Sequence, residues 1–403
     1  MNDDTRKKLI ATSRDMLDRL NSGPKSAADS ALEIPATEYT SESLHQRELA
    51  QLFRRVPLLA AAKAELAQPG SYKTVTLAGV PVLLVHGGDG VYRGFVNACT
   101  HRGSPLKQDC GHASRFTCPY HGWTFNDQGA LIGIAANDKF GEVDKESLGL
   151  VELPVDEHAG LLWVTLEQQA SINTKSFLGE MGEMLEGFNL ADWHFHHRVA
   201  LPGANWKLAF DAHLEFYHLP VLHRDTFGVN ISNEAQYYFF GPHQRIGLMS
   251  ENPLDPQYAE FKGLATQPEE DWDTAPMLFG EWIVFPNISI NCFVAETRVL
   301  VISQVIPETQ YDRSTTIQTY LVEDALEGLP HPGVDEIVAF VQNVVEKEDL
   351  PMSFSQQRTL LSGHLKRVVA GRNEAGLQQH YYWRHKIMSA NDTTSLDALF
   401  CDK

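Results

Sequence analysis

The sequence has few cysteines, few basic residues and no long apolar segment. Its 403 residues include five cysteines, an odd and sparse set that does not fit the disulfide framework of a small secreted protein. Acidic residues outnumber basic ones by 52 to 33, and the net charge of −19 disfavours nonspecific binding to nucleic acid. No stretch approaches the roughly 18–20 apolar residues that span a bilayer, and the polar N-terminus lacks the apolar core of a signal peptide. We therefore expect a cytoplasmic protein that binds neither nucleic acid nor a membrane.

The length and the secondary-structure pattern predict more than one domain. A chain of 403 residues exceeds the size at which one hydrophobic core stops growing. Between residues 72 and 165, short β-branched or alternating runs separated by glycine-rich turns predict an all-β region. Strand patterns return at 235–240, 245–250 and between 282 and 321, and helical patterns follow at 334–348 and 365–371. We predict an α+β protein divided into an N-terminal helical segment that packs with the catalytic domain (1–38), an all-β domain (39–168) and a larger catalytic domain (169–403).

Two cysteine–histidine motifs stand out in the all-β region. Cys99-Thr-His101-Arg-Gly is followed, after sixteen residues, by Cys118-Pro-Tyr-His121-Gly-Trp. Zinc also binds two cysteines and two histidines, but a zinc finger pairs cysteine with cysteine and histidine with histidine. Here each motif offers one thiolate and one imidazole. The pattern favours a Rieske [2Fe–2S] centre, in which the two histidines bind one of the two irons.

A third cysteine–histidine pair, Cys110-Gly-His112, has a similar form. Only five residues separate it from Cys118, which leaves too short a loop for two opposed ligand hairpins. It also lacks the Arg-Gly that follows His101. We interpret it as a loop cysteine and a surface histidine.

The later segment Asn205–His223 contains two histidines near an acid. His218 and His223 are five residues apart, which does not suit one straight helix face, but Pro220 lies between them. A helix that ends near His218, with His223 on the following turn, would bring both side chains together. Glu215 lies three residues before His218, one helical turn away, where its carboxylate can hydrogen-bond that imidazole and fix its tautomer.

Two histidines and one carboxylate form the ligand set of non-haem Fe(II) oxygenases. The candidate third ligand is Asp349, which lies on a late predicted helix. An amphipathic helix with ordinary histidines is an equal alternative on this evidence alone, because the chain has 17 histidines. The Cys/His motifs about a hundred residues upstream favour the iron site.

Together these motifs resemble the large, catalytic subunits of the Rieske non-haem iron oxygenases, the family of the aromatic ring-hydroxylating oxygenases. The resemblance extends from about residue 39 to residue 383. It implies an all-β Rieske domain and a helix-grip (START/Bet v1-like) catalytic domain with a curved antiparallel sheet. It implies one [2Fe–2S] cluster and one mononuclear Fe(II) per chain, with O2 as co-substrate. The implied cluster ligands are Cys99, His101, Cys118 and His121, and the implied iron ligands are His218, His223 and Asp349.

The resemblance also implies catalytic roles and partners. Glu215 and Asp211 are the candidate catalytic acids. Glu215 matches the carboxylate that bridges an iron ligand, here His218, to a cluster histidine, here His121, of a neighbouring subunit. This implies a homotrimer, possibly with a small β subunit. A ferredoxin or flavin reductase would deliver the electrons, so that NAD(P)H acts only indirectly.

A local group of basic side chains surrounds the first motif. On an acidic protein, such a group is a candidate docking surface for an acidic electron donor, although ordinary solvated loop charges are an equal alternative. The group comprises Arg102, Lys107 and Arg115.

We expect the protein to be a mono- or dioxygenase that serves as the terminal oxygenase component of a multicomponent system. We expect hydroxylation or dihydroxylation of a small aromatic substrate, as in aromatic hydrocarbon catabolism. The alternative is a monooxygenase that demethylates a methylated amine or methyl ether or cleaves a C–N bond. Glutamate at position 215 favours this alternative, because it occurs in members that act on quaternary amines. A Rieske ferredoxin would leave the second histidine pair unexplained, and a zinc hydrolase would leave the cluster motifs unexplained.

Overall fold

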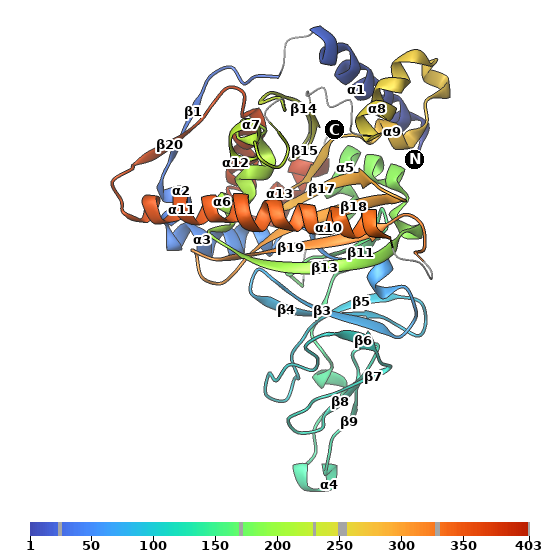
Figure 1. The fold of residues 1–403 in the computed structure, drawn as a ribbon. Coiled ribbons are helices and arrows are strands. Elements are labelled where there is room, and N and C mark those ends of the chain that lie inside the picture. Colours follow the sequence, from blue (N-terminus) through green and yellow to red (C-terminus); the bar gives the residue numbers. More distant parts are fainter. Residues whose placement is uncertain (23–25, 169–171, 229–230, 249–255, 327–330, 402–403) are drawn as a thin grey trace.

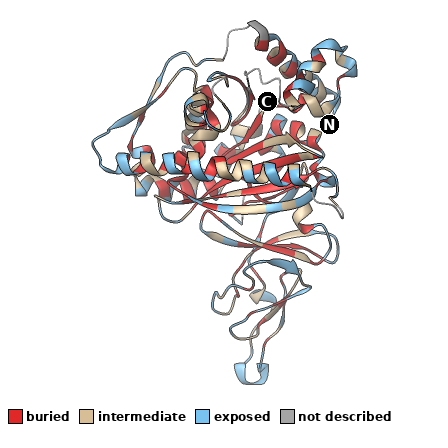
Figure 2. Ribbon diagram, in the orientation of Figure 1, coloured by how far each residue is buried: buried red, intermediate tan, exposed pale blue. Residues whose placement is uncertain are grey.

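The computed structural model describes residues 1–22, 26–168, 172–228, 231–248, 256–326 and 331–401. A slender β-rich unit projects from a larger body of helices and strands (Figure 1). Buried residues concentrate in the large sheet and on the inner faces of its helices, whereas the tip of the projecting unit is mostly exposed (Figure 2). None of the described helices combines the length and apolar character needed to cross a membrane.

The β-rich unit contains three small antiparallel sheets. Their strand orders are β10-β5-β4-β3-β6, β7-β8-β9 and β11-β12-β2. The cluster motifs lie in the loop after β5 and in the turn between β7 and β8, close to the tip. The bounds are β2 (Leu58–Ala62), β3 (Ser71–Leu77), β4 (Val80–His86), β5 (Tyr92–Val96), β6 (Cys110–His112), β7 (Arg115–Thr117), β8 (Thr124–Asn126), β9 (Leu131–Gly133), β10 (Glu152–Leu153), β11 (Val155–His158) and β12 (Leu161–Val164).

The body is built on one seven-stranded antiparallel sheet with the order β13-β19-β18-β17-β16-β15-β14. Both faces of the sheet pack against other layers, so β16, β18 and β19 are buried along most of their length, and β16 and β18 consist mainly of apolar residues. The bounds are β13 (His194–Gly203), β14 (Ala235–Phe240), β15 (His243–Leu248), β16 (Glu281–Val284), β17 (Ile288–Val294), β18 (Arg298–Pro307) and β19 (Ser314–Val322).

Helices cover this sheet on both sides. One long helical run crosses one face: α10 (Pro332–Val344), the π turn η9 (Val345–Asp349) and α11 (Leu350–Leu361) (Figure 1). Val299, Val301 and Val334 form one buried cluster between β18 and α10. The other helices that matter to the site are α3 (Glu42–Glu48), α6 (Trp206–Phe210), η6 (Asp211–Leu214), α7 (Leu219–Leu222) and α12 (Ala375–Met388). The remaining longer helices are α1 (Asp3–Ser22), α5 (Thr174–Leu185), α8 (Pro256–Gly263) and α13 (Thr393–Cys401).

The α+β prediction is confirmed, but one predicted helix is wrong. Residues 365–371 do not form a helix, because Arg367–Ala370 is strand β20 and pairs antiparallel with β1 (Leu32–Pro35). Two adjacent valines favour a strand once a distant partner is available, which the local pattern cannot reveal.

The predicted strand 245–250 is observed as β15, and its last two residues lie outside the described residues. The domain divisions at residues 38 and 168 stay predictions, and residues 169–171 beside the second lie outside the described residues.

A buried group of charges fixes α6, which precedes the candidate iron ligands. Glu48 of α3 lies 2.6 Å from Lys207 Nζ and 3.2 Å from Arg384 Nη1. The Trp206 indole N–H donates to the same carboxylate at 3.0 Å. All three charged side chains are at most 3% exposed. Because each charge has a partner, the cost of burying it is offset, and α6 is held against α3 and α12.

Lys207→Met should therefore lower the free energy of unfolding by about 3–5 kcal/mol, because it leaves the Glu48 carboxylate buried with one cation fewer. Chemical denaturation followed by tryptophan fluorescence measures this. Lys7→Met, in an exposed pair with Asp4, is the matched control and should have no measurable effect. Equal effects of the two substitutions would contradict the account of α6.

Candidate functional site

The two cluster motifs form facing loops at the tip of the β-rich unit. Each loop closes on a glycine with positive φ: Gly103 N–H donates to Cys99 O at 2.7 Å, and Gly122 N–H donates to Cys118 O at 3.0 Å. A side chain at either glycine would be strained, which explains the glycine in each motif. The cysteines are 2% exposed. The imidazole rings of the two motifs lie 4.6 Å apart.

The donor set of these loops fits a [2Fe–2S] cluster. The Nδ1 atoms of His101 and His121 are buried and have no hydrogen-bond partner among the described residues. Burial opposes ionisation of the Cys118 thiol, but hydrogen bonds from the backbone N–H groups of His121 and Tyr120 outweigh it and lower its pKa. Two buried sulfurs and two buried ring nitrogens that lack partners are the ligands that a Rieske cluster requires.

The other singled-out residues of the β-rich unit lie on its surface. Cys110 and His112 are exposed on β6, as expected for a pair outside the cluster. Of the basic group, Arg102 and Arg115 are exposed, and Lys107 Nζ lies over the Tyr72 ring at 5.1 Å. Their role in docking stays a prediction.

The segment with the second histidine pair is less regular than expected. The prediction that a helix ends near His218 is wrong, because the helical run stops at Leu214 and Glu215 is extended. The Glu215 carboxylate accepts hydrogen bonds from the backbone N–H groups of Tyr217 and His218, and this interaction redirects the chain. The short helix α7 then begins with Pro220 in its first turn, where the missing N–H has no cost. The two histidines flank α7 on either side.

These turns bring His218, His223 and Asp349 together. The Asp349 Oδ1 lies 3.2 Å from His223 Nε2 and 3.9 Å from His218 Nε2. One ligand atom of each residue lies within 4.8 Å of the others. The structure therefore gathers the three residues that the sequence proposed as the iron ligands.

Each histidine is held by a second carboxylate at its other ring nitrogen. His218 Nδ1 lies 2.6 Å from Glu215 Oε1, and His223 Nδ1 lies 2.5 Å from Glu348 Oε2. The Thr226 hydroxyl also donates to Glu348, at 3.0 Å. Because a carboxylate only accepts hydrogen bonds, both Nδ1 atoms carry the proton and both Nε2 atoms present lone pairs.

This arrangement fits a metal ion. The two Nε2 lone pairs face the Asp349 carboxylate, whose buried Oδ1 accepts no hydrogen bond from the described residues. The two Nε2 atoms and the Asp349 carboxylate all present lone pairs, and no proton lies between them. A cation bound among these three groups would satisfy them. Two imidazoles and one carboxylate with open positions suit Fe(II).

Sequence reasoning missed Glu348. It lies beside Asp349 in the chain, and the two side chains contact opposite nitrogens of one ring, that of His223. Both belong to the π turn η9, a rare form of helix that is frequent at functional sites. The sequence signal for Glu348 was the acidic run Glu346-Lys-Glu348-Asp349. In a regular α-helix, however, two consecutive side chains point in different directions, so the pattern did not predict that both would contact His223.

Asp211, the second candidate catalytic acid, is not among the three ligand residues. It is half-buried and accepts a hydrogen bond from the Tyr39 hydroxyl at 2.8 Å. Burial raises the pKa of Asp211 to about 6. It lines a cavity of about 450 Å³ that also contacts Glu215, His218 and Glu374. The described lining of this cavity contains no lysine and no arginine.

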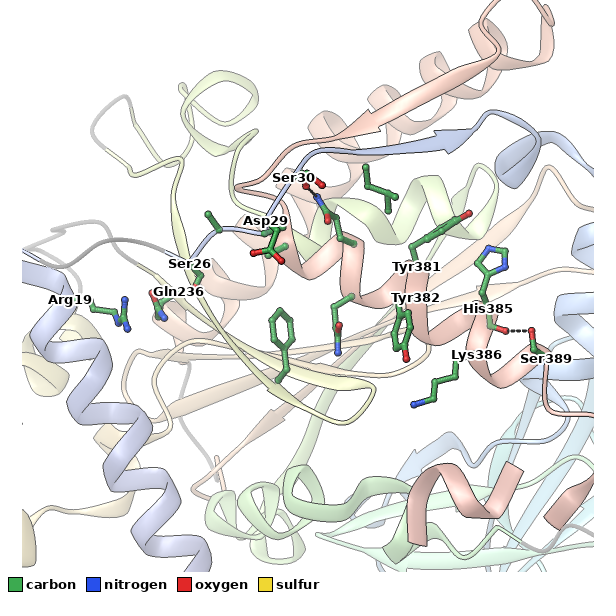
Figure 3. A pocket seen from close by; sticks show the side chains of 17 residues that line it. Arg19, Ser26, Asp29, Ser30, Gln236, Tyr381, Tyr382, His385, Lys386 and Ser389 are labelled. Carbon is green, nitrogen blue, oxygen red and sulfur yellow. Dashed lines mark hydrogen bonds between the residues drawn. The ribbon is translucent and has the colours of Figure 1, made fainter. Parts of the chain in front are cut away.

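A larger groove of about 1030 Å³ lies elsewhere, between the N-terminal segment, β14 and α12. Figure 3 shows Tyr381, Tyr382, His385 and Lys386 lining it from α12. This groove contains none of the candidate ligands. The proposed iron site therefore adjoins the smaller cavity lined by Asp211, Glu215 and Glu374, which we call the acidic cavity.

Comparison with known families agrees with this geometry. Residues 57–153 match the Rieske [2Fe-2S] domain, and residues 190–390 match the ring hydroxylating alpha subunit (catalytic domain). A carnitine monooxygenase oxygenase subunit of Acinetobacter pittii (strain PHEA-2) is 30% identical over 89% of this chain and 95% of its own length. The chain belongs to the Rieske non-haem iron oxygenases.

Two further relatives extend the comparison. The chloroplastic choline monooxygenase of Beta vulgaris is 26% identical over 91% of this chain and 79% of its own length. A crystal structure of a quaternary ammonium Rieske monooxygenase in complex with an inhibitor has a TM-score of 0.76 at 22% identity, and covers 90% of this chain and 96% of that one. The latter likeness confirms the expected fold of a Rieske domain and a catalytic domain.

Membership settles the class and the cofactors. The chain is the terminal component of a Rieske oxygenase, with one [2Fe–2S] cluster and one mononuclear iron. It receives its electrons from a reductase or ferredoxin. These expectations from the sequence are confirmed.

Cys118→Ser should abolish the visible absorption of the Rieske cluster, because the cluster loses one of its two thiolates. Cys110→Ser is the matched control and should keep the spectrum and the acid-labile sulfide. Loss of the cluster in the Cys110 variant, or its retention in the Cys118 variant, would contradict the ligand assignment.

Glu348→Ala should weaken binding of the mononuclear iron about 10–100-fold, because His223 loses the group that orients it. Glu348→Gln keeps an acceptor for the His223 N–H and should bind iron more tightly than the alanine variant. Iron content after dialysis against a chelator measures both, with the cluster spectrum as a control for folding. Unchanged iron retention in the alanine variant would exclude the orienting role.

Proposed function

We propose that this oxygenase acts on a methylated ammonium compound, by demethylation or C–N cleavage. The curated relatives described above are named for carnitine and choline, both of which carry a trimethylammonium group. The observation that carries the proposal is the acidic cavity next to the iron site, which has carboxylates and apolar side chains but no described basic residue. Such a lining favours a cation over an anionic aromatic acid.

We propose the following roles for the residues of the two sites. Bound iron would supply the activation of O2. Glu215 and Glu348 keep both imidazoles in the tautomer that presents Nε2 to Asp349. We infer that Glu215, which contacts His218 Nδ1, also joins this ring to a cluster histidine of another subunit. The cluster ligands are Cys99, His101, Cys118 and His121, and the iron ligands are His218, His223 and Asp349.

The two curated relatives reported above are named for carnitine and choline, so they favour the alternative given by the sequence and lend no support to aromatic hydrocarbon catabolism. The broader expectation of oxygenase chemistry is confirmed. We also propose a cytoplasmic location, because the electron donors of such systems draw on NAD(P)H.

We further propose that the enzyme is a trimer in which the tip of one subunit lies against the body of the next. The cluster loops and α7 lie far apart within one chain (Figure 1). Apolar side chains are exposed at both places: Tyr120 (59%) beside the cluster motif, and Tyr217 (54%) and Val221 (77%) beside the iron ligands. Contact between two copies would bury these side chains and bring each cluster to a neighbouring iron.

Purified enzyme with a suitable reductase should oxygenate tetramethylammonium, choline or carnitine, because the acidic cavity favours cations. Mass spectrometry of products formed from labelled O2 detects the reaction, and His223→Ala is the control that should abolish it while keeping the cluster. Turnover of aromatic acids with none of these ammonium compounds would refute the proposed substrate class.

Mixed trimers test the assembly. Cys118→Ser removes the cluster, and His223→Ala removes the mononuclear iron, so each variant alone should be inactive. Coexpression should restore part of the activity, because some intact clusters then lie next to intact iron sites of neighbouring chains. Inactive mixed trimers would show that electrons pass within one chain.

A further inference from the structure

Glu374 lines the acidic cavity from the turn that precedes α12. His218 and Asp349 line the same cavity, so a small molecule that contacts Glu374 there lies next to the proposed iron site. The cavity volume of about 450 Å³ falls within the range of small-molecule sites, roughly 300–1,000 Å³. The cavity therefore has room for a compact organic molecule beside the candidate ligands.

The turn before α12 fixes the position of the Glu374 side chain. The Gly371 N–H donates to Glu374 Oε2, and the Glu374 N–H donates to Gly371 O at 3.2 Å. The Tyr237 hydroxyl donates to the neighbouring Asn373 O at 3.1 Å. The Glu374 side chain makes no hydrogen bond that caps α12. The turn thus holds the carboxylate at the cavity wall, and the end of the helix does not use it.

The other carboxylates of the described cavity lining already have partners. Glu215 holds the His218 ring, and Asp349 is one of the candidate iron ligands. Asp211 accepts a hydrogen bond from the Tyr39 hydroxyl, and the two cations of the buried charge group beside α6 also act on its charge. These three acids are therefore engaged by the protein or by the iron site.

The charge of Glu374, in contrast, is not compensated. Within the described part of the chain, neither a lysine nor an arginine forms an ion pair with it. Burial raises the pKa of Glu374 and outweighs the hydrogen bond from Gly371, and the negative charge of Glu215 raises this pKa further. A positive charge in the cavity would stabilise the ionised carboxylate.

A quaternary ammonium group suits this combination of one charge and an apolar wall. It has no N–H to donate, so charge attraction and the packing of its methyl groups must recognise it. Leu208, Leu360 and Leu377 belong to the cavity lining and offer apolar contacts for methyl groups. The attraction to Glu374 is stronger in the cavity than in open water, because the effective dielectric constant is lower.

We propose that Glu374 recognises the positive charge of the substrate and holds the methylated group in the acidic cavity next to His218 and Asp349. This inference rests on the proposed function and makes it more specific. It assigns the selection of a cation to one of the carboxylates of that cavity, which is neither an iron ligand nor a residue that orients one.

The test compares two probes of the same shape, choline and its uncharged isostere in which carbon replaces nitrogen. Calorimetric titration of the holoenzyme measures the binding of each. Glu374→Gln keeps an acceptor for the Gly371 N–H and removes only the charge. This variant should bind choline about 10-fold more weakly and the isostere as tightly as the wild type does. The effect is smaller than for a fully buried charge pair, because Glu374 is half-buried.

Two further variants serve as comparisons. Asp211→Asn should weaken choline binding less than Glu374→Gln, because Asp211 already has partners. Glu336→Gln, exposed on α10, makes the same change in net charge and should bind both probes as the wild type does. Iron content and the cluster spectrum verify that each variant is intact.

Equal loss of both probes in Glu374→Gln would overturn the inference, because the carboxylate would then act only on structure. A larger loss of choline binding in Asp211→Asn would also overturn it, because another acid would then select the cation. If Glu374→Gln does not fold, Glu374→Asp decides instead: it keeps the charge, and loss of the choline preference in this variant would overturn the inference.

The inference and the proposed function can fail separately. A wild type that binds choline more tightly than the isostere through Glu374, but oxygenates no ammonium compound, would refute the proposed function and leave the binding site standing. Oxygenation of choline with unchanged choline binding in Glu374→Gln would overturn the inference and leave the proposed function standing.

Discussion

Hydrogen bonds from the two histidine Nδ1 atoms to carboxylates determine the geometry of the catalytic site. Glu215 holds His218, and Glu348 holds His223. A hydrogen bond to a charged group contributes about 1.5–3 kcal/mol, enough to fix both the tautomer and the rotation of each ring. Their Nε2 lone pairs are thereby directed at Asp349. The two carboxylates thus orient both rings of the proposed metal site.

This arrangement depends on departures from regular helix. The extended residue Glu215 ends one helical run, and Pro220 begins the short turn that separates the histidines. The π turn η9 places two consecutive acids at opposite nitrogens of the same ring. Buried charges around Glu48 hold α6 in place upstream. The regular sheet and its covering helices form the frame, and the irregular turns carry the candidate iron ligands.

The sequence predicted those features that depend on residues close together in the chain. The cluster motifs could be recognised because each requires a cysteine, a histidine and a glycine within a few residues of one another. The convergence of His218 and His223 was predicted, although by a helix end that the structure does not have. The orienting role of Glu348 could not be predicted, because it depends on a π turn and on a partner 125 residues away in the chain. Strand β20 was missed for the same reason, since its partner β1 lies near the N-terminus.

The central claim is that His218 and His223 bind iron through Nε2 while carboxylates hold their Nδ1 atoms. A crystal structure of the iron-loaded protein, with anomalous scattering measured at the iron edge, tests it most directly. The account predicts one isolated peak in contact with both Nε2 atoms and the Asp349 carboxylate, separate from the cluster peaks near Cys99 and Cys118. A peak bound to either Nδ1 atom, or to Glu348 in place of Asp349, would contradict it.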